Sequence, residues 1–223
     1  MSINIAIDGP AGAGKSTIAK ALSRELGFIY VDTGAMYRAM GLFLQAKGAS
    51  QDDEKTISEL AEKCSIDIKY ENGQQRVIEG GVDVTDKLRS EDAGKWASAT
   101  SRFGAVRAKL TQLQKDLAAR ENVVMDGRDI GSAVLPGAQL KIYLTASEEA
   151  RGKRRYDELV AKGETADLDQ IIADIAARDH ADMTREISPL VQAEDAILVD
   201  TSDMSIEQVV EHCLGLCREK GIA

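Results

Sequence analysis

Short apolar runs alternate along the chain with segments in which apolar residues recur every three or four positions. The apolar runs predict strands at 3–7, 28–31, 122–126, 140–144 and 196–200. The helical spacing predicts helices at 16–26, 35–46, 147–162, 167–183 and 206–219, with further helical pattern through 90–121. Because a strand, a helix and a second strand open the chain as a βαβ unit, we predict an α/β fold with about five parallel strands.

One stretch departs from this alternation. Residues 66–70 alternate between apolar and polar, Asn72-Gly73 is a strong hairpin signal, and two further short strands are predicted at 76–78 and 82–84. An antiparallel patch that interrupts a βαβ series is best interpreted as a small inserted subdomain.

The loop after the first predicted strand carries the clearest chemical signal. Gly9, Pro10, Ala11, Gly12, Ala13, Gly14, Lys15 and Ser16 fit the pattern G-x-x-x-x-G-K-[ST] and are followed by Thr17. In such a P-loop, backbone N–H groups surround a phosphate at the positive end of a helix, the lysine reaches the β- and γ-phosphates, and the serine hydroxyl binds Mg²⁺. A glycine-rich turn with a solvated lysine is the structural alternative. The strand before the loop and the helix after it favour a magnesium–nucleoside triphosphate site.

Composition and charge narrow the class of protein. The chain has 223 residues, with 28 Lys and Arg against 37 Asp and Glu, a net charge of −9 and a pI of about 4.9, which argues against a general nucleic-acid binder. No apolar run approaches the ~20 residues of a membrane span, and the start of the chain lacks the features of a signal peptide. With three cysteines and no zinc-like pattern, we expect reduced thiols and a cytoplasmic protein without nucleic-acid or membrane partners.

Polar residues follow several predicted strands at the edge where α/β proteins bind ligands. Asp126 ends an apolar strand and is expected to support the magnesium, although an Asp before Gly127 is also a common turn residue. Thr33 follows another strand, where its structural alternative is a helix N-cap. Arg38 and Arg128 approach the same edge and suit a second phosphate, since a guanidinium binds phosphate through two N–H groups.

Nine of the fourteen arginines lie between Arg102 and Arg185, which indicates either a local anion site or solvated, ion-paired helices. Arg151, Arg154 and Arg155 share one helix face, where Glu148 and Glu149 are the structural alternative to an anion. A second such face carries Arg178, Asp182 and Arg185; by itself this spacing favours a plain surface network of ion pairs.

Together these residues resemble the bacterial-type cytidylate kinases, which are nucleoside monophosphate kinases. The resemblance rests on GPAGAGKST at 9–17, DTGAMYR at 32–38, DGRDIGS at 126–132 and the R-D-x-x-D-x-x-R run at 178–185, which precedes Pro189, Leu190 and Val191. It extends over nearly the whole chain. The first motif alone indicates a nucleotide binder, and the last two are specific to cytidylate kinases.

The resemblance implies a P-loop NTPase-type three-layer fold in one domain. Its core would be 1–35, 103–150 and 169–223, with a monophosphate-binding insert at about 36–102 and a lid at about 151–168. The implied ATP-binding residues are 9–17 and Arg151, with Ser16 and Asp126 at the metal. The implied CMP-binding residues are Thr33, Tyr37, Arg38, Ser98, Arg107, Arg128, Asp129, Arg178, Asp182 and Arg185. The implied catalytic residues are Lys15, Arg128, Arg154, Arg155 and Arg178.

The expected reaction is therefore phosphoryl transfer from ATP, with Mg²⁺, to CMP and also dCMP, by a monomer. The choice of Ser98 over Ser101 rests only on spacing from Arg107, and which lid arginine reaches the transferring phosphoryl group stays open. Two alternatives remain: a kinase of the same fold acting on AMP, UMP, shikimate or dephospho-coenzyme A, and a P-loop regulatory NTPase. The sequence has no Asn-Lys-x-Asp-type guanine motif, which disfavours the second.

Overall fold

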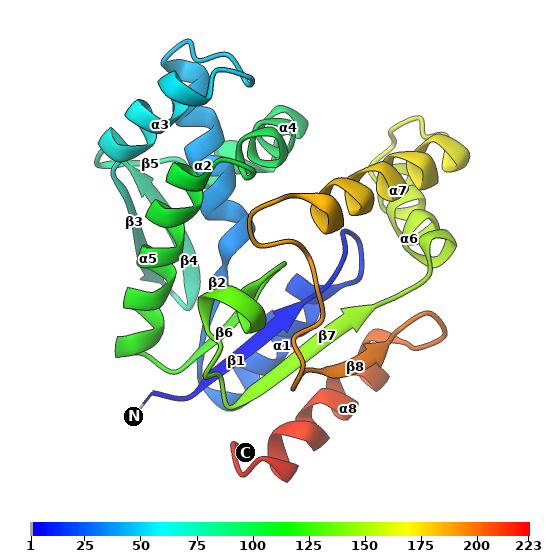
Figure 1. Cartoon of the computed structure of the whole chain (residues 1–223). Helices are drawn as coiled ribbons and strands as arrows, with labels where there is room; N and C mark the ends of the chain where they lie inside the picture. Colours follow the sequence, from blue (N-terminus) through cyan, green and yellow to red (C-terminus); the bar gives the residue numbers. More distant parts are fainter. Residues whose placement is uncertain (1) are drawn as a thin grey trace.

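The computed structural model describes residues 2–223, and its centre is a five-stranded parallel sheet (Figure 1). The strands are β1 (Asn4–Asp8), β2 (Ile29–Asp32), β6 (Val123–Gly127), β7 (Leu140–Thr145) and β8 (Ile197–Asp200), in the order β2-β6-β1-β7-β8. Each pairs in parallel with its neighbours. The prediction of an α/β fold with five parallel strands is confirmed. All carboxyl ends consequently meet at one edge of the sheet.

Helices cover both faces of this sheet and make it the middle layer. Alternation along β1 sends Ile5 and Ile7 to one face, where they pack with α1 (Lys15–Leu26) and α8 (Ile206–Glu219). Ala6 faces the other way, into the core formed with α2 (Thr33–Ala46) and α5 (Gly104–Arg120). The central strands are buried throughout because each face contacts helices.

The insert folds as predicted into an antiparallel sheet of β3 (Ile66–Glu71), β4 (Gln74–Glu79) and β5 (Val82–Asp83). Asn72 and Gly73 form its turn with φ of 52° and 74°, the left-handed values that a tight hairpin requires. Gln75 ties the small sheet to the large one: its side chain accepts from the Asp32 N–H at 2.9 Å and donates to the Asp32 carbonyl at 3.1 Å. The insert thus packs directly against the end of β2.

Three details differ from the sequence pattern. The helical stretch at 90–121 is two helices, α4 (Glu91–Thr100) and α5, because the chain becomes extended at Phe103. Helix α3 (Glu54–Lys63), which we did not predict, begins at an Asp53 cap that accepts from the Thr56 N–H. A 3₁₀ helix, Thr85–Arg89, and a π-helical turn, Ile130–Val134, complete the region between the insert and β7.

Two further helices, α6 (Glu148–Ala161) and α7 (Leu168–Thr184), form a hairpin beside the loop that follows β1 (Figure 1). Both helices were predicted to within about a turn. Within residues 2–223, no helix combines the length and apolar character that a membrane crossing needs. The three cysteines are free and buried, Cys64 in one core cluster and Cys213 and Cys217 in the other.

Candidate active site

The loop between β1 and α1 has the backbone shape that a phosphate-binding loop needs. Gly9, Gly12 and Gly14 have φ of 146°, 76° and 90°, values that a residue with a Cβ rarely adopts. At Gly9 a Cβ would also overlap the carbonyl oxygen of Leu144, so β7 passes directly against the loop. Lys15 is buried, and its Nζ donates to the Pro10 carbonyl at 2.7 Å. Burial, and secondly the charge of Arg128, lower the pKa of Lys15.

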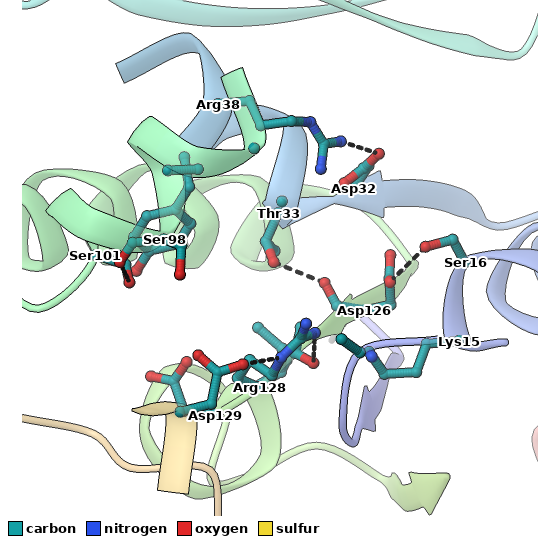
Figure 2. A pocket seen from close by; sticks show the side chains of 18 of the residues that line it. Lys15, Ser16, Asp32, Thr33, Arg38, Ser98, Ser101, Asp126, Arg128 and Asp129 are labelled. Atoms are coloured by element: carbon teal, nitrogen blue, oxygen red, sulfur yellow. Dashed lines mark hydrogen bonds and ion pairs between the residues drawn. The ribbon is translucent and has the colours of Figure 1, made fainter. Parts of the chain in front are cut away.

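Asp126 lies beside this loop at the end of β6, and two hydroxyl groups hold its carboxylate. Figure 2 shows one of them, the hydroxyl of Ser16. Ser16 Oγ donates to its Oδ2 at 2.9 Å, and the Tyr30 hydroxyl donates to its Oδ1 at 2.8 Å. Burial and the nearby charge of Asp32 raise the pKa of Asp126. Asp126 belongs to a buried strand, so the turn alternative is wrong. Its carboxylate and the Ser16 hydroxyl are hard oxygen donors, the type that fits Mg²⁺ shared with phosphates.

Thr33 has a different local role from the N-cap that its position suggests. The cap of α2 is Asp32, whose Oδ1 accepts from the Ala35 N–H at 2.8 Å, and the N-cap alternative for Thr33 is therefore wrong. Thr33 Oγ1 donates instead to the Asp126 carbonyl at 2.7 Å and so joins β6 to the start of α2. The second Asp32 oxygen receives Arg38 Nη2 at 3.1 Å, which directs that guanidinium back toward the sheet edge.

A cavity of about 300 Å³ opens at this edge and brings most of the predicted residues together. It is lined by Lys15, Ser16, Thr33, Tyr37, Arg38, Ser98, Arg107, Asp126, Arg128, Asp129, Arg178, Asp182 and Arg185. They come from α1, α2, α4, α5, the end of β6 and the loop after it, and α7 with the residue that follows it. Ser101 also lines the cavity, and Figure 2 places it beside Ser98. The geometry therefore leaves the choice between the two serines open.

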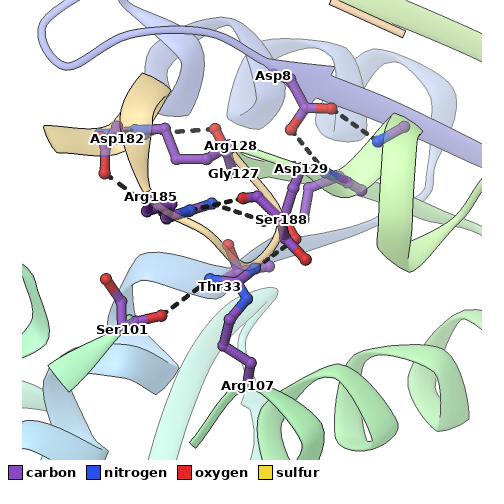
Figure 3. Close-up of polar contacts among 12 residues, drawn as sticks. Asp8, Thr33, Ser101, Arg107, Gly127, Arg128, Asp129, Asp182, Arg185 and Ser188 are labelled. Carbon is purple, nitrogen blue, oxygen red and sulfur yellow. Dashed lines mark hydrogen bonds and ion pairs between the residues drawn. The ribbon is translucent and has the colours of Figure 1, made fainter. Parts of the chain in front are cut away.

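Ion pairs in the cavity wall form one connected network (Figure 3). Arg107 and Arg185 both pair with Asp129, the latter at 3.5 Å. Asp182 pairs with Arg185 at 3.7 Å and with Arg128 at 2.8 Å. These side chains are between 5% and 21% exposed, so Asp182 and Arg185 do not form a plain surface pair. Arg178, the other arginine of that helix face, is exposed and lies outside this network. The acids hold the guanidinium groups in place inside the cavity.

Several guanidinium groups in this cavity have a nitrogen atom without a hydrogen bond. Within residues 2–223, the Nε atoms of Arg38 and Arg107 and Nη2 of Arg185 are buried and make no hydrogen bond, although each guanidinium pairs with a carboxylate. Arg178 is exposed and makes no ion pair within residues 2–223, and partial desolvation, followed by the charge of Arg128, lowers its pKa. Buried polar groups are almost always satisfied in proteins. Free donors around an enclosed space are therefore suited to an anionic, hydrogen-bonding ligand.

A second cavity, of about 610 Å³, lies on the other side of the P-loop. It is lined by residues 12–18, Arg154, Arg155, Glu158, Thr201, Met204, Ile206 and Val209. Gly12, Lys15 and Ser16 line both cavities. A phosphate chain that runs from the second cavity along the P-loop would consequently meet, at the loop, a ligand bound in the first cavity.

Comparison with known proteins agrees with this geometry. The family model for cytidylate kinase matches residues 5–219. The chain belongs to the cytidylate kinase family. Among its relatives, the cytidylate kinases of Caldicellulosiruptor bescii and Pelotomaculum thermopropionicum are each 50% identical, over 96% and 93% of this chain and 95% and 92% of theirs. That of Halalkalibacterium halodurans is 46% identical over 98% of both chains.

The fold has structural relatives at much lower identity. The crystal structure of an uncharacterised protein from Eubacterium ventriosum aligns with a TM-score of 0.55 at 12% identity, covering 98% of this chain and 99% of the other. At that identity the likeness shows the fold alone. The cytidylate kinase assignment therefore rests on the sequence relatives and the family model.

The three arginines of α6 have three different sets of partners, although their spacing puts them on one helix face. Arg154 Nη2 donates to the Thr201 carbonyl at 2.5 Å, which places the guanidinium at the second cavity. Arg155 pairs with Glu158 at 2.8 Å at the surface of the same cavity. Arg151 is buried and lines neither cavity. The acidic partners in the structure are Glu158 and Asp179, not the neighbouring Glu148 and Glu149.

The sequence did not reveal the apolar wall of the second cavity. Met204 precedes α8, and Ile206 and Val209 stand in its first turn, where their spacing resembles that of any amphipathic helix. Ile206 is 57% exposed, but single exposed apolar residues are common on protein surfaces. The position of these residues beside the phosphate-binding loop identifies this wall, and that position depends on the folded structure.

Proposed function

We propose that this kinase transfers the γ-phosphoryl group of ATP to CMP, giving ADP and CDP, and that it accepts dCMP as well. The observation that carries the proposal is the meeting of two cavities at the P-loop, one basic and hydrogen-bonding and the other partly apolar. The cytidylate kinase relatives support CMP as the acceptor. An adenine base fits the apolar wall near Ile206, with its phosphates along the P-loop.

Asp129 and its two arginines would recognise the base. Cytosine presents an amino donor beside a ring nitrogen and a carbonyl acceptor. The carboxylate of Asp129 accepts from the amino group, while the free N–H groups of Arg107 and Arg185 donate to the acceptors. Ser98 or Ser101 completes this side, and Asp182 with Arg178 faces the sugar. Burial raises the pKa of Tyr37 to about 12, so this cavity-lining phenol stays neutral and adds no competing charge.

Arg38 and Arg128 would hold the CMP phosphate between the base site and the P-loop. Both line the acceptor cavity, and each is steered by a carboxylate, Asp32 and Asp182 respectively. Guanidinium groups fixed in this way bind a phosphate with less loss of conformational freedom than mobile side chains. The CMP phosphate oxygen that attacks the γ-phosphoryl group would thereby be held on the side of the P-loop where Lys15 lies.

Phosphoryl transfer requires little covalent chemistry from the protein. Lys15 and the lid residues Arg154 and Arg155 neutralise charge on the moving group, and Arg128 and Arg178 do so from the acceptor side. Mg²⁺, held through Ser16 and Asp126, would neutralise the β- and γ-phosphates. Closure of the α6–α7 hairpin and the insert over both nucleotides would exclude water as a competing acceptor.

We further propose that the protein is cytoplasmic and monomeric. A monomer is expected because one chain supplies both cavities. Light scattering tests the oligomeric state.

The test is ADP formation from ATP and Mg²⁺ with CMP, dCMP, UMP, AMP, shikimate, dephospho-coenzyme A or no acceptor. Turnover confined to CMP and dCMP is the expected result. Faster turnover with any other acceptor would overturn the base-recognition proposal, and turnover without an acceptor would indicate an NTPase. Lys15→Ala serves as the inactive control, and wild-type turnover by that variant would remove Lys15 from the mechanism.

A further inference from the structure

Arg151 and Asp179 form an ion pair at the base of the α6–α7 hairpin. Arg151 Nη1 lies 2.5 Å from Asp179 Oδ2, and each residue is 4% exposed. The sequence placed Arg151 among the ATP-binding residues, yet it lines neither cavity, and its Nε donates to the Ala146 carbonyl at 2.9 Å. Both charged groups are therefore committed to protein partners.

The pair holds one residue of the P-loop from both sides. Arg151 Nη1 donates to the carbonyl of Ala11 at 2.8 Å, and the Ala11 N–H donates to Asp179 Oδ1 at 3.3 Å. Ala11 has no side chain able to fix its own backbone, and the next residue, Gly12, lines both cavities. A Cβ on Gly12 would lie 3.3 Å from Cβ of Arg151, so the arginine packs directly on the loop. The backbone before Gly12 is thus set by two side chains from another part of the chain.

The same pair joins the P-loop to the acceptor cavity. Asp179 follows Arg178 and precedes Asp182 by one turn of α7, and both of those residues line that cavity. Gly152 lets α6 cross α7 at close range, because a Cβ there would overlap Ile172. The hairpin is consequently one packed unit that touches the loop through Arg151 and Asp179.

We propose that Arg151 and Asp179 are positioning residues that fix the P-loop through Ala11 and hold it in register with the acceptor site. The inference rests on the proposed kinase reaction. Neither side chain lines either cavity. Their joint effect is to place the Gly12 region between the two nucleotides, where an error of about 1 Å costs on the order of 100-fold in rate. Arg151 also neutralises Asp179, whose carboxylate would otherwise stand unpaired beside the phosphates.

The experiment compares Arg151→Met, Asp179→Leu and the double variant in the full chain. We expect Arg151→Met to lower kcat about 100-fold, with KM for ATP changed less than about threefold, because orientation is lost while ligand contacts remain. The double variant should be less impaired than Arg151→Met, since it leaves no unpaired buried carboxylate. Arg218→Met, which removes a surface pair with Glu211, is the matched control and should retain wild-type rates.

A second measurement needs no turnover. In ¹⁵N-labelled protein the Ala11 amide should exchange with solvent at least about 10-fold faster in the double variant than in wild type, whereas amides in the β1 strand should be unchanged. If Arg151→Met instead raises KM for ATP at constant kcat while Asp179→Leu is neutral, Arg151 is an ATP ligand and the proposal is wrong. Unchanged kcat and unchanged Ala11 exchange would also overturn it. Amide exchange is measured without substrate. It therefore tests the positioning role even if the proposed kinase reaction is wrong, and the two failures can be told apart.

Discussion

At the scale of single residues, Asp129 is a buried carboxylate on the wall of the acceptor cavity, and the function proposed above gives it the role of recognising the base. Two guanidinium groups, those of Arg107 and Arg185, pair with it from α5 and from the end of α7. Their charges compensate for the cost of burying the carboxylate. In the proposed role, the carboxylate would accept a hydrogen bond from the amino group of the base.

Replacement of Asp129 by Asn should therefore alter the choice of base. We expect Asp129→Asn to raise KM for CMP by about 10- to 100-fold, since an amide is a weaker acceptor and leaves Arg107 without its charged partner. Turnover of UMP relative to CMP should rise, because the amide N–H₂ can donate to the carbonyl that uracil has in place of the amino group. Steady-state kinetics with both nucleotides provide the measurement. An unchanged CMP-to-UMP ratio would contradict the assignment, and Asp116→Asn, at an exposed site, is the control.

Asp8 offers a residue-level prediction about pH. Its carboxylate accepts from the N–H groups of Ile130 and Gly131 at 2.8 and 2.7 Å, and burial raises its pKa to about 6. The folded state thus binds this proton more tightly than the unfolded chain does, so the associated stability is present below about pH 4 and is lost as pH rises to about 6. Relative to Asp8→Asn, wild-type protein should lose about 3 kcal/mol of unfolding free energy between pH 4 and pH 7.

Urea unfolding of wild type and Asp8→Asn at several pH values measures this difference. If the unfolding free energies of the two proteins change with pH in parallel, Asp8 does not titrate in this range. The same contacts explain the location of the π-helical turn Ile130–Val134 directly after Asp129. Asp8 binds the first N–H groups of the turn and so links the strand before the P-loop to the segment that carries the base-recognition carboxylate.

At the scale of elements, α2 and α4 meet through a glycine. A Cβ on Gly41 would lie 2.8 Å from Cβ of Trp96 and 2.9 Å from the Ala97 nitrogen. The contact sets the position of α4 and with it Ser98 on the cavity wall. The close approach explains why a glycine occupies the interior of a buried helix despite its poor helix propensity.

Gly41→Ala should consequently destabilise the protein, by about 1–3 kcal/mol from overpacking, and raise KM for CMP by displacing Ser98. The matched control is Gly215→Ala in α8, where the nearest atom to a new Cβ is the flexible end of Arg218 at 3.9 Å. That change should stabilise by about 0.5–1 kcal/mol through helix propensity. Thermal unfolding of both variants tests the pair. Stabilisation by Gly41→Ala would show that α4 moves aside without cost.

The elements also show what a sequence determines locally and what it leaves to packing. The strand, P-loop and helix at the start of the chain were predictable because turn glycines, apolar runs and helical spacing act over a few residues. The break between α4 and α5 was not, since residues 101–103 include neither proline nor glycine and nothing in their sequence indicates the extended backbone of Phe103. The partners of Arg151 and Arg154 come from α7 and the loop after β8, so no spacing within α6 could indicate them. Arg155, by contrast, pairs within α6 with Glu158, three residues further on.

At the scale of the whole molecule, a net charge of −9 coexists with two basic cavities. Of the nine arginines between Arg102 and Arg185, six line one of the cavities, an arrangement that favours anion binding, although four of the six also pair with acidic side chains. The α6–α7 hairpin contributes Arg154 and Arg155 to one cavity and Arg178 and Asp182 to the other. A ligand that binds in one cavity and orders the hairpin should therefore strengthen the binding of a ligand in the other cavity.

We accordingly expect CMP to bind several-fold more tightly when a non-hydrolysable ATP analogue and Mg²⁺ are present, since the first ligand has already met part of the ordering cost. By reciprocity CMP should strengthen binding of the analogue by the same factor. Isothermal titration calorimetry in both orders measures the two factors. If each ligand binds with the same affinity in the presence and absence of the other, the hairpin does not couple the two cavities.

The shared wall between the cavities also bears on inhibitor design. Gly12, Lys15 and Ser16 line both cavities, and Gly12 has a left-handed backbone that favours glycine. If a compound spanned the wall and contacted these three residues, a substitution that weakened its binding there would also damage the proposed substrate sites. Resistance at those positions would come at the expense of kinase activity, whereas a single side-chain change at the exposed Ile206 could weaken a compound that binds only there.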